Sequence, residues 1–184
     1  MFTIREEFKK AHPEITEKLL STEYDFLHTN EHLGDNICLL GLGGSYSYGT
    51  NIEGSDVDIR GVATLRKEEI LGTANFEQFE NHATDTTIYG IKKFFNLLAA
   101  CNPNIVELVG LRDCDYAYIS PIGQMILDNK HLFLNKHAAD SFGGYANAQL
   151  KRIKIATMRD LLPNIEKQEY MADSMSNSVF NLMS

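Results

Sequence analysis

Two short motifs in the N-terminal half of the chain contain the residue types that phosphate chemistry needs. Gly43, Gly44 and Ser45 follow an apolar run, residues 37–42, that predicts a short buried strand. Glycine lets the backbone approach a ligand closely, and backbone amides at the start of a helix bind anions. We therefore expect a triphosphate to bind at Gly44 and Ser45, with the Ser45 hydroxyl as an additional donor.

Asp56 and Asp58 form the second motif. Together with Arg60 they alternate with Val57 and Ile59, so a strand here places both carboxylates on one face and apolar side chains on the other. Neighbouring carboxylates on one strand face repel each other. A divalent cation removes this conflict, because Mg²⁺ prefers carboxylate oxygens shared with phosphates and water. The spacing indicates a platform for Mg²⁺ or Mn²⁺ on which a phosphate reacts.

Gly44-Ser45 followed by Asp56-x-Asp58, with apolar strands around both, resembles the DNA polymerase beta superfamily of nucleotidyltransferases. The resemblance implies two divalent ions held by Asp56 and Asp58. It also implies a third carboxylate, from a later strand, that completes the second metal site and activates the attacking hydroxyl. Asp85, at the start of a run rich in strand-forming residues, is our candidate for that role. Two alternatives remain: Asp85 caps the following helix, or the third carboxylate is one of Glu77, Glu80 and Glu107.

Motifs further along the chain narrow the resemblance. Asn102-Pro103-Asn104 predicts a helix start and is followed by an apolar-Glu-Leu sequence. Together with Gly144-Tyr145-Ala146 and Gln149-Leu150 it is similar to the RNA-ligase-associated, RNA repair subgroup of the superfamily. The resemblance covers residues 37–155. It implies transfer of a nucleoside monophosphate from an NTP to an acceptor hydroxyl, an RNA end, with release of pyrophosphate and association with an RNA ligase.

Two other hypotheses stay open for the same site. The acceptor could be a protein hydroxyl or a small molecule, or the chain could be a noncatalytic nucleotide- or RNA-binding module. Lys151 is our candidate for a further nucleotide contact, because helices after the catalytic sheet supply such a lysine in this superfamily. The alternative is that Lys151, with Arg152, Lys154 and Arg159, forms a solvated helix face. Tyr46 and Tyr48 either stack on the base or sugar or pack within the fold.

The expected fold class is α+β, a polymerase beta-like nucleotidyltransferase fold with a small mixed sheet, helices mainly on one face, and a helical segment after it. We expect residues 1–130 to form the catalytic domain and residues 131–184 to be helical and shorter than in the subgroup. Pro13 predicts two short helices that divide near His12 and cover the sheet. Residues 73–84 are polar and predict a loop.

Charge and composition restrict the location and the partners. The formal net charge of −8 argues against a long nonspecific contact with duplex nucleic acid, which needs many Lys and Arg. No segment has the length and apolar character of a membrane span, and the N-terminus does not resemble a signal peptide. Three scattered cysteines without a CxxC pair suit a reducing compartment. We therefore expect a cytoplasmic protein without membrane contact.

One competing motif points to a different chemistry. His28-x-x-Glu31-His32 matches the H-x-x-E-H pattern of inverted zinc metalloproteases, in which both histidines lie one helical turn apart. The nearby Gly34-Asp35-Asn36 favours a loop instead. Surface histidines are the preferred interpretation.

Overall fold

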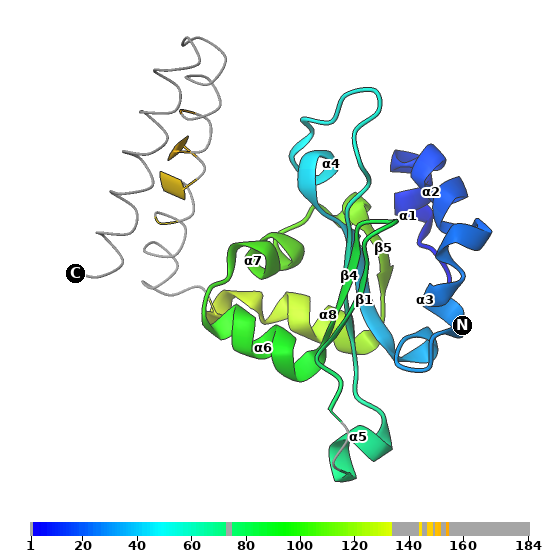
Figure 1. Cartoon of the computed structure of the whole chain (residues 1–184), viewed down its shortest axis with the longest axis vertical. Helices are drawn as coiled ribbons and strands as arrows, with labels where there is room; N and C mark the ends of the chain where they lie inside the picture. The colour runs from blue at the N-terminus through cyan, green and yellow to red at the C-terminus, as the bar shows by residue number, and fades with distance from the viewer. Residues whose placement is uncertain are drawn as a thin grey trace, which may run out of the picture. The chain divides into compact units, whose positions relative to one another are not determined.

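The structure, a computed structural model, describes residues 2–72 and 75–133 and, beyond them, residues 144, 147–148, 150–151 and 154. The chain divides into two compact units, Met1–Ala138 and Ala139–Ser184. Figure 1 shows the first unit as a sheet between two groups of helices. The domain boundary expected between residues 130 and 131 stays a prediction.

A five-stranded mixed sheet forms the centre of the first unit. Its strands are β1 (Ile37–Leu42), β2 (Ile59–Ala63), β3 (Gln78–Asn81), β4 (Thr86–Gly90) and β5 (Tyr116–Ile119), in the spatial order β3-β4-β2-β1-β5. β1 pairs antiparallel with β2 and β5, and β3 pairs antiparallel with β4. β2 and β4 run parallel. The predicted α+β class and mixed sheet are confirmed.

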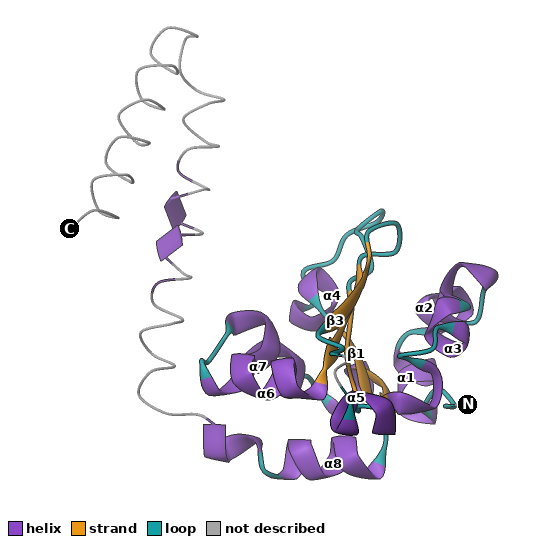
Figure 2. Ribbon diagram, turned by 60° about the horizontal axis from the view of Figure 1, so that its bottom comes forward, coloured by secondary structure: helices purple, strands orange, loops and turns teal. Residues whose placement is uncertain are grey.

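Helices lie on both faces of this sheet, as Figure 2 shows. They are α1 (Glu6–Ala11), α2 (Pro13–Leu19), α3 (Phe26–Thr29), α4 (Gly44–Tyr48), α5 (Lys67–Leu71), α6 (Ile91–Ala99), α7 (Pro103–Val109) and α8 (Pro121–Asp128). Phe8 of α1 and Leu27 of α3 belong to the core on one face, and Phe94 of α6 and Ile105 of α7 belong to the core on the other. Every residue of β1 is buried. A strand that is apolar on both sides needs cover on both faces, so the expectation of helices mainly on one face does not describe this sheet.

The local signals for helix boundaries agree with the structure. Pro13 occupies the first turn of α2, directly after α1 ends, as predicted. The side-chain oxygen of Asn102 accepts a hydrogen bond from the Asn104 amide at 3.1 Å, and Pro103 begins α7. At the start of α8 the Ser120 hydroxyl accepts from the Gly123 amide at 3.1 Å. Each cap satisfies a backbone donor that the helix itself leaves without a partner.

The polar segment between residues 73 and 84 differs from its prediction as a loop, because it contains β3. This strand lies at the edge of the sheet, and none of its residues is fully buried. A strand exposed in this way does not need the apolar alternation of a half-buried strand. Its pairing with β4, and not its composition, makes it a strand.

The residues that follow the Asp56 motif also differ from their prediction. β2 begins at Ile59, so Asp56 and Asp58 lie in the loop that leads into the strand. Pairing stops there because Ile59 is opposite Leu42, the last residue of β1. The expected alternation is nevertheless present: Val57 and Ile59 are buried, and Asp56 is exposed.

A buried carboxylate connects the N-terminal helices to the sheet through a hydrogen bond. Asp115, just before β5, has no exposed side-chain area. Its oxygens lie 2.9 Å from His12 Nε2, at the junction of α1 and α2, and 2.7 Å from Arg112 Nε. Burial raises the pKa of Asp115, but hydrogen bonds from Arg112 and His12 outweigh burial and lower the pKa below its ordinary value.

We expect Asp115→Asn to lower the free energy of unfolding by about 2–3 kcal/mol, because His12 and Arg112 lose a charged acceptor that is itself fully buried. The folded-state pKa is lowered, so the contribution is present above about pH 4, the unfolded value, and is lost as the pH falls through the folded value. Urea unfolding at neutral and acidic pH measures both effects. Asp113→Asn is the control: Asp113 is exposed and pairs with Arg5 at 3.0 Å, so its loss should cost under about 1 kcal/mol. Equal effects of the two variants would contradict the assignment.

The second unit contributes only a few described residues. Gly144, Asn147, Ala148, Leu150, Lys151 and Lys154 are helical and exposed. Most of the segment expected to be helical, residues 131–184, lies outside the described residues, including Arg152 and Arg159. Among those that the structure describes, no helix has the length and apolar character that a membrane span requires.

Candidate active site

The parallel pairing of β2 with β4 brings two of the predicted carboxylates together. Ile59 is opposite Thr86, so the residues just before them, Asp58 and Asp85, enter the same end of the sheet side by side. The Ile59 amide donates to the Asp85 carbonyl at 3.0 Å, which extends the pairing to Asp85. Asp85 has a φ of 42°, in the left-handed region that Asp tolerates better than most residues.

The surroundings of Asp58 disfavour its charge. Burial raises the pKa of Asp58 to about 6, and a side-chain hydrogen bond with Asp85 acts in the same direction. Two carboxyl groups can share such a bond only if one of them holds a proton. The Arg60 guanidinium opposes these effects, because its Nη2 donates to Asp58 Oδ1 at 2.8 Å. Arg60 therefore does not fully compensate the negative charge of the two carboxyl groups, and a bound cation would stabilise their ionised forms.

The Gly44 turn lies directly against Asp58. The Gly43 amide donates to the Asp58 carbonyl at 2.9 Å, and α4 begins at the next residue. Gly44 has a φ of 61°, and a Cβ at this position would overlap Asp58 Oδ2. Glycine is thus required twice here, for its backbone conformation and for its lack of a side chain. Ser45 follows in the first turn of α4 and is half-buried.

Glu107 connects α7 to this turn. Its Oε1 accepts from the Gly44 amide at 2.9 Å and from the Ser47 hydroxyl at 2.8 Å. The Glu107 carboxylate is close enough to Asp58 to contribute to its raised pKa. Glu107 therefore occupies, in the free protein, the backbone donor that the sequence analysis assigned to a nucleotide phosphate.

Asp56, two residues before Asp58, is exposed. It lines a cavity of about 540 Å³ together with Asp85 and residues of α2 and of the 3₁₀ turn η1 (Thr22–Tyr24). Asp85 therefore belongs both to the carboxylate pair and to the cavity wall.

The donor set fits a hard divalent cation. Asp58 and Asp85 are in contact, and Asp56 is separated from Asp58 by one residue. Within the described ranges, no three His, Cys, Asp or Glu side chains are already gathered as a metal-binding group. Mg²⁺ suits such a site, because it takes one or two carboxylates and completes its shell with water and substrate phosphates.

The other acidic candidates lie elsewhere. Glu77 pairs with Lys93 of α6 at 3.6 Å, and Glu80 is exposed on β3, where it accepts a hydrogen bond from Gln78. Of the four acids that the sequence left as candidates for the third carboxylate, Asp85 and Glu107 are the two that act on Asp58. Lys151 belongs to the second unit, and its contact with a nucleotide stays a prediction.

The histidines of the H-x-x-E-H pattern have separate structural partners. α3 ends at Thr29, so His28 and His32 do not share a helix. His28 packs against Phe2 with ring centroids 4.5 Å apart, and His32 stacks on Phe76 at 4.8 Å. The Nδ1 atom of His32 lies 2.6 Å from Glu69 Oε1. This geometry does not form the zinc motif, which needs both histidines on one helical face.

Sequence reasoning missed two contacts of this site. It assigned no role to Arg60, which neutralises part of the Asp58 charge, and it ranked Glu107 as a weak metal ligand rather than a partner of Gly44. The spacing of Arg60 from Asp58, two residues along an extended chain, was a usable signal for the first. No local signal existed for the second, because Glu107 and Gly44 are 63 residues apart.

The sheet order, the helical cover and the acids at the start of two parallel strands define a polymerase beta-like nucleotidyltransferase fold. A model of RlaP, the RNA repair pathway DNA polymerase beta family, matches residues 11–169. The chain belongs to this family. No curated protein and no solved structure matches it.

Proposed function

We propose that the protein is a metal-dependent nucleotidyltransferase that transfers a nucleoside monophosphate from an NTP to a hydroxyl at an RNA end. The placement of Asp58 and Asp85 side by side at the start of two parallel strands, beside the Gly44 turn, is the observation that supports this function most directly. Membership in an RNA repair family supports an RNA acceptor. A noncatalytic binding module would have little reason to keep two carboxylates in contact.

In the proposed reaction the backbone at Gly44 and the Ser45 hydroxyl hold the outer phosphates. Asp56, Asp58 and Asp85 would hold the metal, which supplies charge stabilisation for the phosphates and lowers the pKa of the attacking hydroxyl. The acceptor oxygen forms a bond to the α-phosphorus while the bond from that phosphorus to the bridging oxygen of the β-phosphate breaks. Pyrophosphate leaves with the electron pair, and Asp85 accepts the hydroxyl proton. Arg60 keeps Asp58 oriented.

A transfer assay tests this function. The full chain is incubated with Mg²⁺ or Mn²⁺ and each labelled NTP, with single-stranded RNA, with a protein acceptor, and without acceptor. Label on RNA together with release of pyrophosphate supports the proposal. Label on protein would replace the RNA acceptor by a protein hydroxyl, and nucleotide binding without any transfer would indicate a noncatalytic module. Omission of the metal, with EDTA present, should abolish transfer.

The position of Glu107 leads to a separate prediction. Because its carboxylate occupies the Gly44 amide and repels an incoming phosphate, Glu107→Gln should strengthen NTP binding about fivefold, equivalent to ~1 kcal/mol. The glutamine oxygen can still accept from Gly44, so the fold should persist. Calorimetry of NTP binding with and without Mg²⁺ measures the change. Glu17→Gln, an exposed change on α2, is the matched control. Weaker binding in Glu107→Gln would mean that this carboxylate supports the phosphate site instead of competing for it.

A further inference from the structure

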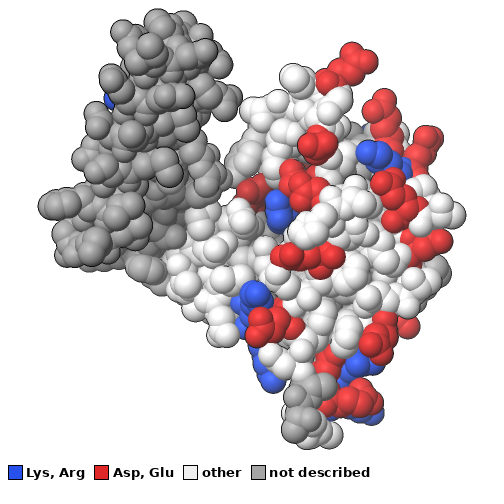
Figure 3. Space-filling model, in the orientation of Figure 1, with Lys and Arg blue, Asp and Glu red and all other residues white. Residues whose placement is uncertain are grey.

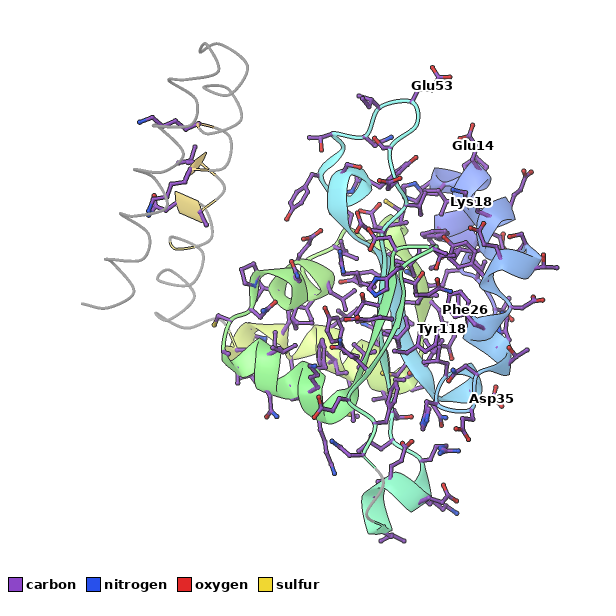
Figure 4. The ribbon with its side chains drawn as sticks, viewed as in Figure 1. Glu14, Lys18, Phe26, Asp35, Glu53 and Tyr118 are labelled. Carbon is purple, nitrogen blue, oxygen red and sulfur yellow. The ribbon has the colours of Figure 1, made fainter. Side chains whose placement is uncertain are left out.

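The cavity beside Asp85 lies at one end of the sheet and has walls from four elements of the first unit. Lys18 comes from α2, Tyr24 from η1, Asp56 from the residues leading into β2, and His82 and Asp85 from the turn between β3 and β4. Figure 4 shows Lys18 on α2 at the same end of the sheet as the loop that carries Glu53. The cavity volume is about 540 Å³. That is the size of a site for one small molecule or one nucleoside, and it is too small for a duplex.

A series of contacts connects the Gly44 turn to this cavity. Glu107 contacts Gly44, a Cβ on Gly44 would touch Asp58, Asp58 contacts Asp85, and Asp85 lines the cavity. The described lining includes Asp56 and Asp85 but not Gly44 or Glu107. If the outer phosphates lie at Gly44, the leaving pyrophosphate is on that side of Asp58. In-line displacement then requires the attacking hydroxyl to come from the side away from Gly44. We assign that approach to the cavity, because Asp85 lines it and Gly44 does not.

The charge of the lining disfavours a triphosphate in this cavity. Three carboxylates, from Glu23, Asp56 and Asp85, face one ammonium group, from Lys18, among the described lining residues. Figure 3 shows acidic side chains spread over the visible face of the first unit, with few basic ones between them. Carboxylates accept hydrogen bonds from sugar hydroxyls, whereas they repel phosphates. The lining therefore suits the hydroxyl-bearing end of an acceptor, with a single phosphate at Lys18.

We propose that this cavity binds the 3′-terminal ribonucleoside of a single-stranded RNA acceptor, with Lys18 at the phosphodiester that precedes it. The inference rests on the proposed nucleotidyl transfer and names the part of the acceptor that this site recognises. The ribose hydroxyls meet the carboxylates, and the 3′-hydroxyl is directed to Asp85. A base that enters a cavity of this size must first leave its stack, so an unpaired end is preferred over a blunt duplex end.

The test uses the full chain and a short single-stranded RNA labelled at its 5′ end. Fluorescence anisotropy without NTP gives the Kd for RNA, and the transfer assay gives KM separately for RNA and for NTP. We expect Lys18→Ala to raise both the Kd and the KM for RNA about tenfold, because a charge-assisted contact is lost. The KM for NTP should stay unchanged. His82→Ala, on the exposed turn, should weaken RNA binding about threefold.

Two controls make the result specific. Lys92→Ala removes an exposed lysine from α6, on the other face of the sheet, and should change neither constant. A terminal 2′-deoxynucleotide or a blunt duplex should bind wild type more weakly than the single-stranded RNA does. The proposal would be overturned if neither Lys18→Ala nor His82→Ala weakened RNA binding. It would also be overturned if these variants raised the KM for NTP instead of the KM for RNA.

Different results would contradict the cavity assignment and the proposed function. Transfer to RNA that is insensitive to Lys18 leaves the proposed function intact and removes the cavity assignment. RNA binding that depends on Lys18, in a protein that transfers no nucleotide, keeps the cavity assignment and removes the catalytic function. Absence of RNA binding by wild type would overturn the cavity assignment directly.

Discussion

Asp58→Asn is expected to reduce nucleotidyl transfer about a thousandfold and to leave the fold intact. Asp58 is the carboxylate that joins the Gly44 turn to Asp85, and its loss removes charge from the proposed metal site. A bound metal contributes several kcal/mol to transition-state stabilisation, and each 1.36 kcal/mol is about tenfold in rate. Asparagine has nearly the same volume and no longer repels Asp85, so we expect the unfolding free energy to change by under about 1 kcal/mol.

Single-turnover rates with Mg²⁺ measure this effect, and urea unfolding verifies the fold. Asp56→Asn should show a loss of the same order, because the second carboxylate contributes to the same platform. Asp128→Asn is the matched control: Asp128 is exposed at the end of α8 and accepts from Gln124 at 2.8 Å, a bond that the asparagine oxygen can keep. Transfer at the wild-type rate in Asp58→Asn would show that the reaction does not use this site.

Gly44→Ala is expected to reduce transfer at least about a hundredfold. The added Cβ would overlap Asp58 Oδ2, so either the carboxylate or the turn must move. A displacement of about 1 Å in catalytic groups is enough for a loss of this size. The left-handed φ of 61° adds about 1–2 kcal/mol of backbone strain for alanine. We expect the unfolding free energy to fall by that amount or more.

A second glycine separates strain from collision. Gly49 directly follows α4 with a φ of 67°, and a Cβ there would meet no described atom within 4 Å. Gly49→Ala should therefore carry the same backbone strain as Gly44→Ala and retain transfer within a few-fold of wild type. Transfer rates and urea unfolding of both variants make the comparison. Equal losses of transfer would show that stability, and not the contact with Asp58, explains the Gly44 effect.

The sequence by itself determined the local parts of this protein. The apolar run before Gly43 predicted β1, and Pro13 and Asn102 predicted helix starts that the structure contains. These features depend on residues within one helical turn or one strand, so periodicity and capping chemistry are sufficient to predict them. The motif order also pointed to the superfamily to which the chain belongs.

Only the tertiary structure decided which acids meet. Asp58 and Asp85 become neighbours because β2 and β4 pair in parallel in one register. Glu107 reaches Gly44, 63 residues away along the chain, because α7 packs against the sheet. Pairing with β4 likewise makes a polar edge segment into β3. Buried residues on both faces of the sheet are covered by helices on both sides. Register and packing depend on contacts between distant segments, and residue spacing along the chain carries no information about those contacts.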